Sequence, residues 1–437
     1  MSDEKNVSRR EVLKGGSLAA ALSAGMPLAV ARAIEAAQDP AAAAKAAQDA
    51  AKAEPVKLAW IGTGVQGQND MKQLAKVPGV EFVAICDIYE PNVKAALEIA
   101  GPNCKVYSDY RKMMEQKNIQ GVGIATPLYL HAPMAIAAME AGKDVYCEKM
   151  MAYTIDEAKK MVRTADRTKR KLQIGHQRRY SADYHHALDL IKKGYFGKIT
   201  HVRAQWNRNG SWRRAVPDPK LEKLLNWRLY DEFSRGLMAE LGSHQIDVTN
   251  WFLGAHPIAV VGIGGIDHYK DGREVYDNVQ VVFEYPGGEK LTYQSIQTNA
   301  FDDFSEQFMG TKGTMIVSEA AGKSMMFKEQ SAEDFEFAKF SQSKTKVGNK
   351  EAILLDAGAT TRQDKREKTA GQALAGGGTN KNNWALSLED WVDCIRTDRK
   401  PFCDGRIGLA DVGCVIASLK AMKEGTRVEI THDMLHV

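Results

Sequence analysis

The sequence predicts an α/β protein with two domains, an N-terminal domain built on a parallel sheet and a C-terminal α/β domain with a mostly antiparallel, open sheet. Two observations lead to this prediction. Short apolar runs alternate with helical patterns over residues 56–178, which is typical of doubly wound folds. Over residues 179–437 strand-like runs follow one another more directly, and Pro286-Gly287-Gly288 predicts a hairpin turn between two of them.

The elements follow from apolar periodicity and from turn residues. We expect the strands of the first domain at 57–62, 80–87, 120–126, 144–148 and 171–176. A helix at 181–193 opens the second domain, whose strands we expect at 198–206, 259–266, 277–285, 290–299, 305–318 and 324–329. Residues 331–383 are polar and predict a long surface excursion. Two helices, at 385–397 and 407–423, close the chain.

The turn after the first expected strand is rich in glycine. Gly62, Gly64 and Gly67 form the pattern G-x-G-x-x-G, and a helical pattern starts at once. Such a turn lets backbone N–H groups at the helix N-terminus approach a pyrophosphate. Asp87 ends the next apolar run, where a carboxylate binds both ribose hydroxyls and repels a 2′-phosphate. The sequence therefore predicts a dinucleotide site that prefers NAD to NADP, built from Gly62, Thr63, Gly64, Val65, Gln66, Gly67 and Asp87.

Two further clusters follow strands of the same domain. Thr126-Pro127, with His131 shortly after, ends one strand, and Glu148-Lys149 ends the next. Ligands of open α/β sheets lie outside the carboxyl ends of the strands, so we expect all five residues beside the cofactor. Lys149 falls near the nicotinamide end, where its ammonium group can donate a hydrogen bond to a reacting hydroxyl. The alternative is a surface lysine paired with its neighbour.

A candidate general base lies in the second domain. Gly236–Phe252 reads as one helix in which Glu240, His244, Asp247 and Trp251 share a face. Histidine titrates near neutrality, and the flanking carboxylates of Glu240 and Asp247 can fix its tautomer and support its charged form. On spacing alone, an ordinary solvated Glu240–His244 pair is the favoured interpretation.

Together these motifs resemble the Gfo/Idh/MocA oxidoreductases. The resemblance covers nearly all of residues 56–425 and includes the runs 235–247 and 391–396. It implies a Rossmann domain, a second domain that often oligomerises through its sheet, and hydride transfer between NAD(P) and a sugar, cyclitol or related polyol. Lys149 matches the family's Glu-Lys-Pro lysine and His244 its catalytic histidine, so the resemblance implies catalytic roles for both.

Three positions depart from the family pattern. Met150 replaces the proline after the lysine and removes a backbone constraint. Glu240 replaces the aspartate usually found four residues before the histidine, and Arg235 replaces a common glycine. These departures argue against a standard substrate.

Three functions remain open on the sequence alone. The first is a sugar oxidoreductase with tightly held NAD. The second is a glycosidase that oxidises a ring hydroxyl transiently, eliminates the leaving group, adds water and reduces the ketone again. Both need the same NAD, base and lysine, so the sequence does not separate them. The third is a non-catalytic sensor of a dinucleotide or a sugar.

The substrate side is a Trp/Arg-rich stretch at residues 206–228. Tryptophan faces stack on the apolar face of a pyranose, and arginines bind ring hydroxyls or a carboxylate. Core tryptophans with surface arginines are an equally good interpretation, whereas a net charge of +4 gives little support to nucleic-acid binding. The candidate substrate residues are Arg178, Tyr180, Trp227 and Arg228.

The first residues have the pattern of a targeting signal. Ser8-Arg9-Arg10 resembles a twin-arginine export signal, a weakly apolar stretch follows at 15–30, and Ala31-Arg32-Ala33 offers a cleavage site. We therefore expect a signal peptide at 1–33, an Ala-rich linker at 34–55, and a protein exported folded by the twin-arginine machinery to the periplasm. NAD loaded in the cytoplasm would stay bound. An uncleaved membrane anchor is the alternative.

The six cysteines show no metal-binding spacing, and we expect no metal. Cys86 and Cys147 fall inside expected strands and should be buried thiols. An oxidising compartment would allow a Cys394–Cys403 disulfide.

Overall fold

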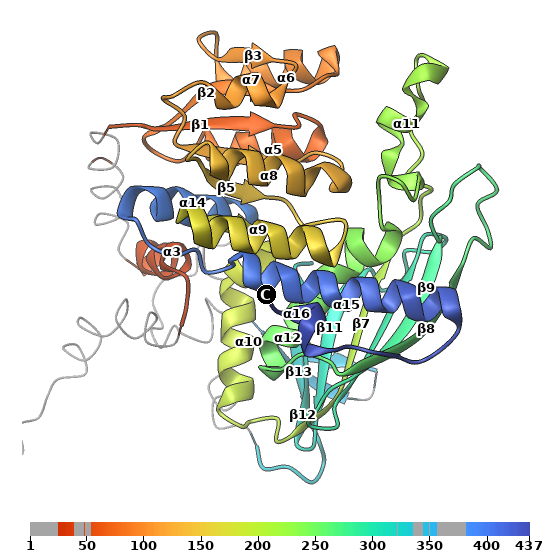
Figure 1. Cartoon of the computed structure of the whole chain (residues 1–437). Helices are drawn as coiled ribbons and strands as arrows, with labels where there is room; N and C mark the ends of the chain where they lie inside the picture. The colour runs from red at the N-terminus through yellow and green to blue at the C-terminus, as the bar shows by residue number, and fades with distance from the viewer. Residues whose placement is uncertain are drawn as a thin grey trace, which may run out of the picture.

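The computed structural model describes residues 25–38, 48, 54–320, 322–334, 344–348, 350–355 and 382–437. Two sheets organise these residues, one in the orange N-terminal part of Figure 1 and one in the green and cyan part. The long helix α15 (Gly405–Glu424) packs on α9 (Ile155–Thr168) of the first part and on β8 (Ala259–Gly265) of the second.

The first sheet has six parallel strands in the order β3-β2-β1-β4-β5-β6, which confirms the Rossmann prediction. Its strands are β1 (Val56–Ile61), β2 (Val80–Cys86), β3 (Lys105–Tyr107), β4 (Gly121–Ile124), β5 (Asp144–Cys147) and β6 (Leu172–Ile174). Its helices include α5 (Val65–Leu74), α6 (Glu90–Ala100), α7 (Tyr110–Met114) and α8 (His131–Glu140). The edge strand β3 was not predicted, because it has only three residues and none of them is buried.

The second sheet is mixed and mostly antiparallel, as predicted. Its order is β14-β15-β13-β12-β11-β7-β10-β9-β8-β16, and β7–β10 is its parallel pair. The strands besides β8 are β7 (Ile199–Asn207), β9 (Asn278–Glu284), β10 (Lys290–Ile296), β11 (Phe304–Gly310), β12 (Gly313–Val317), β13 (Met325–Lys328), β14 (Lys344–Val347), β15 (Lys350–Leu354) and β16 (Val428–Glu429). The remaining helices include α10 (Ala182–Lys192), α11 (Glu222–Leu225), α12 (Ser243–Leu253) and α16 (His432–Leu435).

Part of the predicted polar excursion belongs to this sheet. The β14–β15 hairpin lies within residues 331–383 and pairs with β13. Ala352 and Ile353 are buried there, so a short apolar segment inside a polar region extends the sheet. Residues 335–343, 349 and 356–381 of the predicted excursion lie outside the described residues.

The C-terminal helix α14 (Asn383–Thr397) packs on the first sheet, although the sequence assigned it to the second domain. Trp391 of α14 is fully buried, and its ring centroid lies 5.8 Å from that of Tyr146, which in turn lies 6.2 Å from Trp60. The first domain is thus completed by residues from the end of the chain.

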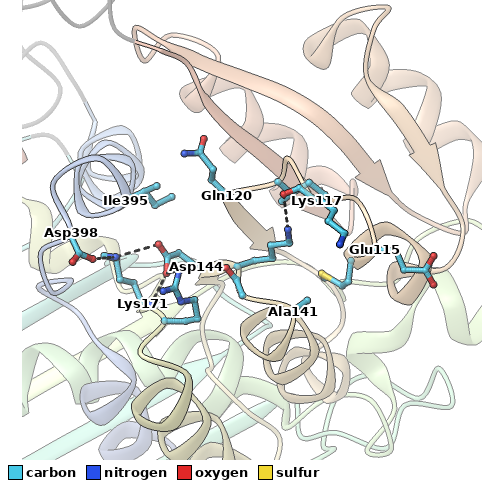
Figure 2. A pocket seen from close by; sticks show the side chains of 13 residues that line it. Glu115, Lys117, Gln120, Ala141, Asp144, Lys171, Ile395 and Asp398 are labelled. Atoms are coloured by element: carbon cyan, nitrogen blue, oxygen red, sulfur yellow. Dashed lines mark hydrogen bonds and ion pairs between the residues drawn. The ribbon is translucent and has the colours of Figure 1, made fainter.

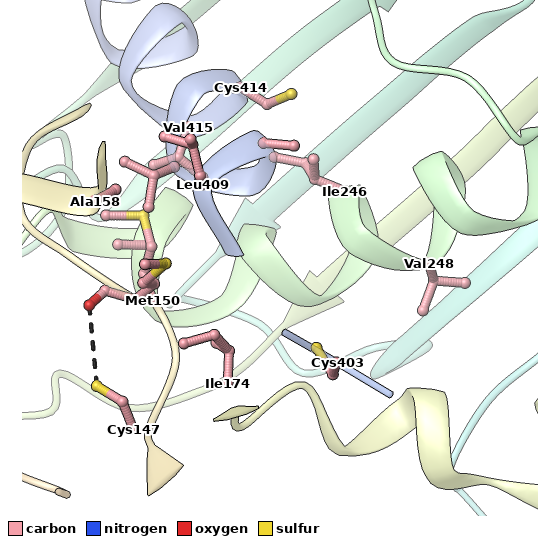
Figure 3. Close-up of a cluster of buried hydrophobic side chains, with 14 of the residues drawn as sticks. Cys147, Met150, Ala158, Ile174, Ile246, Val248, Cys403, Leu409, Cys414 and Val415 are labelled. Carbon is pink, nitrogen blue, oxygen red and sulfur yellow. Dashed lines mark hydrogen bonds between the residues drawn. The ribbon is translucent and has the colours of Figure 1, made fainter. Parts of the chain in front are cut away.

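A shared apolar core joins the two parts. Figure 3 shows Cys147 and Ile174 of the first sheet facing Leu409 and Val415 of α15, with Ile246 of α12 on the other side. Burial of such side chains stabilises the contact by about 1.5–3 kcal/mol each. This core fixes the ends of the parallel strands relative to α12.

The segment that contains the predicted cleavage motif is helical. Helix α3 (Leu28–Gln38) packs on α14 with Val30 fully buried, and Nη1 of Arg32 lies 2.6 Å from Oδ2 of Asp393. The twin-arginine motif itself lies outside the described residues, as does most of the predicted linker. Within the described ranges, none of the helices combines the length and apolar character that a membrane span requires.

All six cysteines are free and buried. The prediction of buried thiols at Cys86 and Cys147 is confirmed. The Cys394–Cys403 disulfide that the sequence would allow is not formed.

Candidate functional site

The glycine-rich turn between β1 and α5 has no room for a side chain at Gly62 or Gly67. Gly62 has φ +80°, and a Cβ there would lie 2.7 Å from the carbonyl carbon of Ala125. A Cβ on Gly67 would overlap the carbonyl oxygen of Gly62. Glycine at both positions therefore lets the chain turn tightly from β1 into α5 and pass close to β4.

The predicted acidic residue lies against the same turn. Oδ2 of Asp87 accepts hydrogen bonds from the backbone N of Thr63 at 2.7 Å and from its Oγ1 at 3.0 Å. Gly64 precedes α5 without a side-chain cap, so the amide groups at this helix N-terminus suit an anion. Val65 and Gln66 form the first turn of the helix. A tight glycine cradle, an uncapped helix end and a carboxylate at the end of β2 fit a dinucleotide.

His131 lies next to the loops that follow β4 and β5 and contacts both of them. Its ring nitrogens lie 2.9 Å from the carbonyl oxygen of Thr126, after β4, and 2.9 Å from that of Met150, after β5. Burial lowers the pKa of this histidine, and it is almost fully enclosed. His131 thus positions the two strand-end loops, one of which includes Pro127.

Glu148 and Lys149 extend from the end of β5, and the Lys149–Met150 peptide bond is cis. The carboxyl group of Glu148 accepts a hydrogen bond from the Tyr146 hydroxyl at 3.2 Å, and burial raises its pKa to about 7. The Nζ atom of Lys149 donates to the backbone oxygen of Glu240 at 3.0 Å. Lys149 therefore reaches from the first domain to the segment that carries His244.

That segment is not the single regular helix predicted for 236–252. Met238–Gly242 forms one π-helical turn before α12. A π turn adds a residue to the helical period, so Glu240 and His244 no longer occupy the i and i+4 positions of one α-helix. The carboxylate of Glu240 turns instead to Nε of Arg228 at 2.8 Å, and its backbone oxygen receives Lys149.

His244 is buried at the start of α12, between groups from both domains. Its ring centroid lies 5.4 Å from that of Trp206 and 6.1 Å from that of His176. Burial and then the positive charge of Lys149 hold its pKa well below the ordinary value. Its Nδ1 atom has no hydrogen-bond partner in the part of the chain that the structure describes. The imidazole is therefore neutral at neutral pH and can accept a proton.

Asp247 does not support His244 as expected. Its Oδ1 accepts from Nε of Arg179 at 2.7 Å, and Trp251, one turn on, packs against the same arginine. Neither Asp247 nor Glu240 is hydrogen-bonded to His244 among the contacts of the described residues. The prediction that these carboxylates flank the imidazole is wrong, because the π turn and the arginines redirect them.

The candidate substrate residues divide into two pairs. Arg178 is buried between Glu306 and Glu319, and Tyr180 is fully buried with its hydroxyl near the backbone N of Cys403. Neither offers a surface to a substrate. Trp227 and Arg228 are partly exposed beside the Glu240 carboxylate, and the guanidinium carbon of Arg228 lies 4.3 Å from the Trp227 ring. The structure thus brings only this second pair to the site.

Sequence reasoning missed a buried cluster behind His244. Nε2 of His176 lies 3.2 Å from Oδ2 of Asp411, and its Nδ1 lies 3.8 Å from Oδ2 of Asp247. Burial, and then the charge of Asp247, raise the pKa of Asp411 well above its ordinary value. No local signal links residues so far apart in the sequence. Their side chains meet only once β6, α12 and α15 pack together.

A cavity of about 760 Å³ lies elsewhere. It is lined by residues at the start of β4, β5 and β6, among them Gln120, Asp144 and Lys171. Figure 2 shows Lys171 paired with Asp144 and Asp398 on its wall. These positions are at the amino ends of the strands, so this cavity is on the opposite edge of the sheet from the glycine turn.

Comparison with known proteins agrees with this geometry. Residues 56–176 match the oxidoreductase family with an NAD-binding Rossmann fold, and residues 189–430 match the C-terminal α/β domain of the same family. The chain therefore belongs to the Gfo/Idh/MocA oxidoreductase family.

Several of the similar proteins have names that refer to carbohydrates. The chain is 32% identical over 189 residues to glycosyl hydrolase family 109 protein 1 of Shewanella sp. (strain ANA-3), a match that spans 41% of this chain and 40% of that protein. The fold is that of aldose-aldose oxidoreductase from Caulobacter crescentus (TM-score 0.65, 22% identity, 86% and 100% of the two chains covered). It is also that of the WlbA dehydrogenase from Bordetella pertussis, solved with NADH and UDP-GlcNAcA (TM-score 0.64, 21% identity, 86% and 99% covered).

Proposed function

We propose that the protein uses NAD to transfer a hydride from or to a carbinol carbon of a sugar or polyol. One observation carries this proposal: Lys149, at the end of a Rossmann strand, meets the segment of a buried, neutral His244 from the other domain. A proton donor for an oxyanion and a proton acceptor on the two sides of one site are what alcohol oxidation needs.

The first domain holds the cofactor. The turn at Gly62–Gly67 receives the pyrophosphate and Asp87 a ribose, which favours NAD over NADP. Thr126, Pro127 and Glu148 line the strand ends where the nicotinamide belongs. Bound NAD supplies the hydride acceptor.

The chain's own residues move the proton. A substrate hydroxyl gives its proton to the neutral imidazole of His244, and the Lys149 ammonium group stabilises the developing alkoxide by a hydrogen bond. The backbone oxygen of Glu240 holds that ammonium group in place. The buried ring of Trp206 packs beside His244 and helps to position its imidazole.

A second candidate function uses the same residues. In a glycosidase of this kind, oxidation of a ring hydroxyl acidifies the neighbouring C–H, the aglycone leaves by elimination, water adds, and the returned hydride restores the hydroxyl. The sequence similarity to a glycosyl hydrolase family 109 protein favours this reaction, although the match spans about two fifths of each chain. NAD is regenerated in each cycle.

Two assays decide between them. The full chain is incubated with NAD and a panel of sugars and polyols, and separately with aryl glycosides without added NAD. Reduced NAD that accumulates with a sugar indicates the dehydrogenase, and released phenol without net reduction indicates the glycosidase. A chain that binds NAD and sugars but turns over neither class is a sensor, and the proposal is then wrong.

We also propose export by the twin-arginine route and retention of NAD in the exported protein. The motif at Ser8-Arg9-Arg10 supports this. Replacement of both arginines by lysine should keep the protein in the cytoplasm, and cell fractionation reads this out. We further propose self-association through the open face of the second sheet, where Ile263 is 69% exposed, and light scattering of the purified chain tests it.

A further inference from the structure

We propose that the substrate carries a negative charge, in the simplest case the carboxylate of a uronic acid, which binds to Arg208, Arg214 and Arg228 beside the reacting centre. This inference rests on the proposed function and deepens it by naming the class of sugar. Below, these three residues are called the arginine cluster.

The cluster adjoins the groups proposed to react. The guanidinium carbon of Arg208, just after β7, lies 5.1 Å from the ring centroid of Trp206, which is the ring beside His244. Arg228 is bonded through Nε to the carboxylate of Glu240, whose backbone oxygen receives Lys149. The cluster and the Lys149–His244 pair are thus two ends of one region.

Arg214 is held next to Arg228 by the backbone. Its N donates to Oδ1 of Asn226 at 2.7 Å, and Nδ2 of Asn226 donates back to its carbonyl oxygen at 3.0 Å. Asn226 is buried and directly precedes Trp227-Arg228. This reciprocal pair ties the 214 segment to the segment that carries Arg228.

The cluster is short of negative charge. Glu240 pairs with Arg228, but no carboxylate of the described residues pairs with the side chain of Arg208 or Arg214. Other arginines nearby do have carboxylate partners, since Arg178 lies between Glu306 and Glu319. Arg213, adjacent to Arg214 in the chain, pairs with Glu222 and Asp271.

The unbalanced charges repel one another. Both side chains keep an exposed part, and partial desolvation and then the charge of Arg228 lower the pKa of Arg208 and of Arg214. Three positive charges beside the single carboxylate of Glu240 repel one another, and a bound anion would offset this unfavourable free energy. Guanidinium groups bind a carboxylate in a bidentate geometry, so the cluster fits a sugar whose charged end lies there while a ring hydroxyl reaches the Lys149–His244 pair.

Binding of a matched pair of sugars to the NAD-loaded full chain tests the inference. D-Glucuronate carries a carboxylate at C6 where D-glucose carries a hydroxymethyl group. Isothermal titration calorimetry gives the dissociation constant of each sugar and does not require turnover. We expect glucuronate to bind at least about tenfold more tightly, as one charge-assisted contact provides. The preference should shrink as salt is added. Equal affinities, or a preference for glucose, would overturn the inference.

Single substitutions test whether the arginine cluster causes the preference for glucuronate. Arg208→Gln and Arg214→Gln should each remove most of the preference for glucuronate, whereas Arg203→Gln, at an arginine of β7 outside the cluster, should keep it. A preference that persists in both cluster variants contradicts the assignment. Turnover of neutral sugars without any preference for glucuronate would leave the proposed function standing and refute this inference alone. Tight, selective binding of glucuronate without turnover would support the cluster and refute the proposed function.

Discussion

Two side chains from different domains carry the chemistry proposed for this protein, and their surroundings set their roles. Position at a strand end made Lys149 a candidate, whereas the catalytic role of His244 was implied by the resemblance to the family and was not favoured by spacing alone. The hydrogen-bond partners of the two flanking carboxylates could not be predicted. Glu240 pairs with Arg228 and Asp247 pairs with Arg179, and neither arginine lies on the same helix in the sequence. What keeps His244 neutral is burial and surrounding positive charge, which only the folded chain shows.

Loss of the imidazole should abolish proton removal. We expect His244→Ala to lower kcat by about 10²–10⁴-fold, the usual contribution of a general base. Its pKa is lowered, so the reactive neutral form persists below the ordinary value of 6.5. The acidic limb of kcat in the wild-type protein should therefore fall below that pH. A limb at or above 6.5 that vanishes in His244→Ala would contradict the lowered pKa, and unchanged activity in the variant would remove His244 as the base.

The ammonium group of Lys149 is expected to act mainly on the transition state. Lys149→Ala should lower kcat by about a hundredfold or more with a smaller change in KM, as loss of an oxyanion donor does. NAD binding, followed by fluorescence quenching, serves as the control and should persist. An equal loss of NAD affinity and of kcat would indicate a cofactor-binding role instead.

Apolar periodicity in the sequence predicts some helices and strands correctly and misses others. The longer strands of both sheets and the helix α10 follow their predicted patterns closely, except that the strand expected at 305–318 is two strands, β11 and β12. The π turn at Met238–Gly242 was not predicted, because its apolar residues also fit an α-helical period. The β14–β15 hairpin was missed because a few buried residues lie in a strongly polar stretch.

The glycine turn offers an element-scale prediction with a matched control. Gly67→Ala should destabilise the protein without cofactor by about 1–3 kcal/mol, because the new methyl group overlaps the Gly62 carbonyl oxygen. Gly64 has an ordinary φ of −68°, and a Cβ there would meet only Nδ2 of Asn92 at 3.9 Å. Gly64→Ala should leave the unfolding transition without NAD unchanged. Equal losses in denaturant unfolding of the two variants would contradict this account of the turn.

At the scale of the whole molecule, the domains are joined more closely than the sequence suggests. Both sheets could be predicted from local patterns. The return of α14 to the first sheet and the meeting of His176 with Asp411 depend on long-range packing, which no local pattern encodes. The candidate site lies where these long-range contacts hold α12 against the Rossmann strand ends.

A buried histidine links stability to pH. The ring of His185 is buried with Nε2 2.8 Å from the carbonyl oxygen of Arg179, and burial lowers its pKa from 6.5 to about 4. The unfolded chain therefore binds a proton more readily, so the stabilisation is complete above pH 6.5 and is lost as the pH falls toward 4. Relative to His185→Gln, the wild-type protein should lose up to about 3 kcal/mol over this range. Parallel unfolding free energies of the two proteins across this range would contradict the buried, neutral state.

The central claim is that a sugar hydroxyl is oxidised at the Lys149–His244 pair with NAD as acceptor. Stopped-flow absorbance of NADH, recorded when the NAD-loaded protein meets its sugar, tests this most directly. We predict a rise in the wild-type protein, lasting for a dehydrogenase and transient for a glycosidase, and no rise in His244→Ala despite bound NAD. Product formed without any NADH signal, or an equal rise in His244→Ala, would contradict the account.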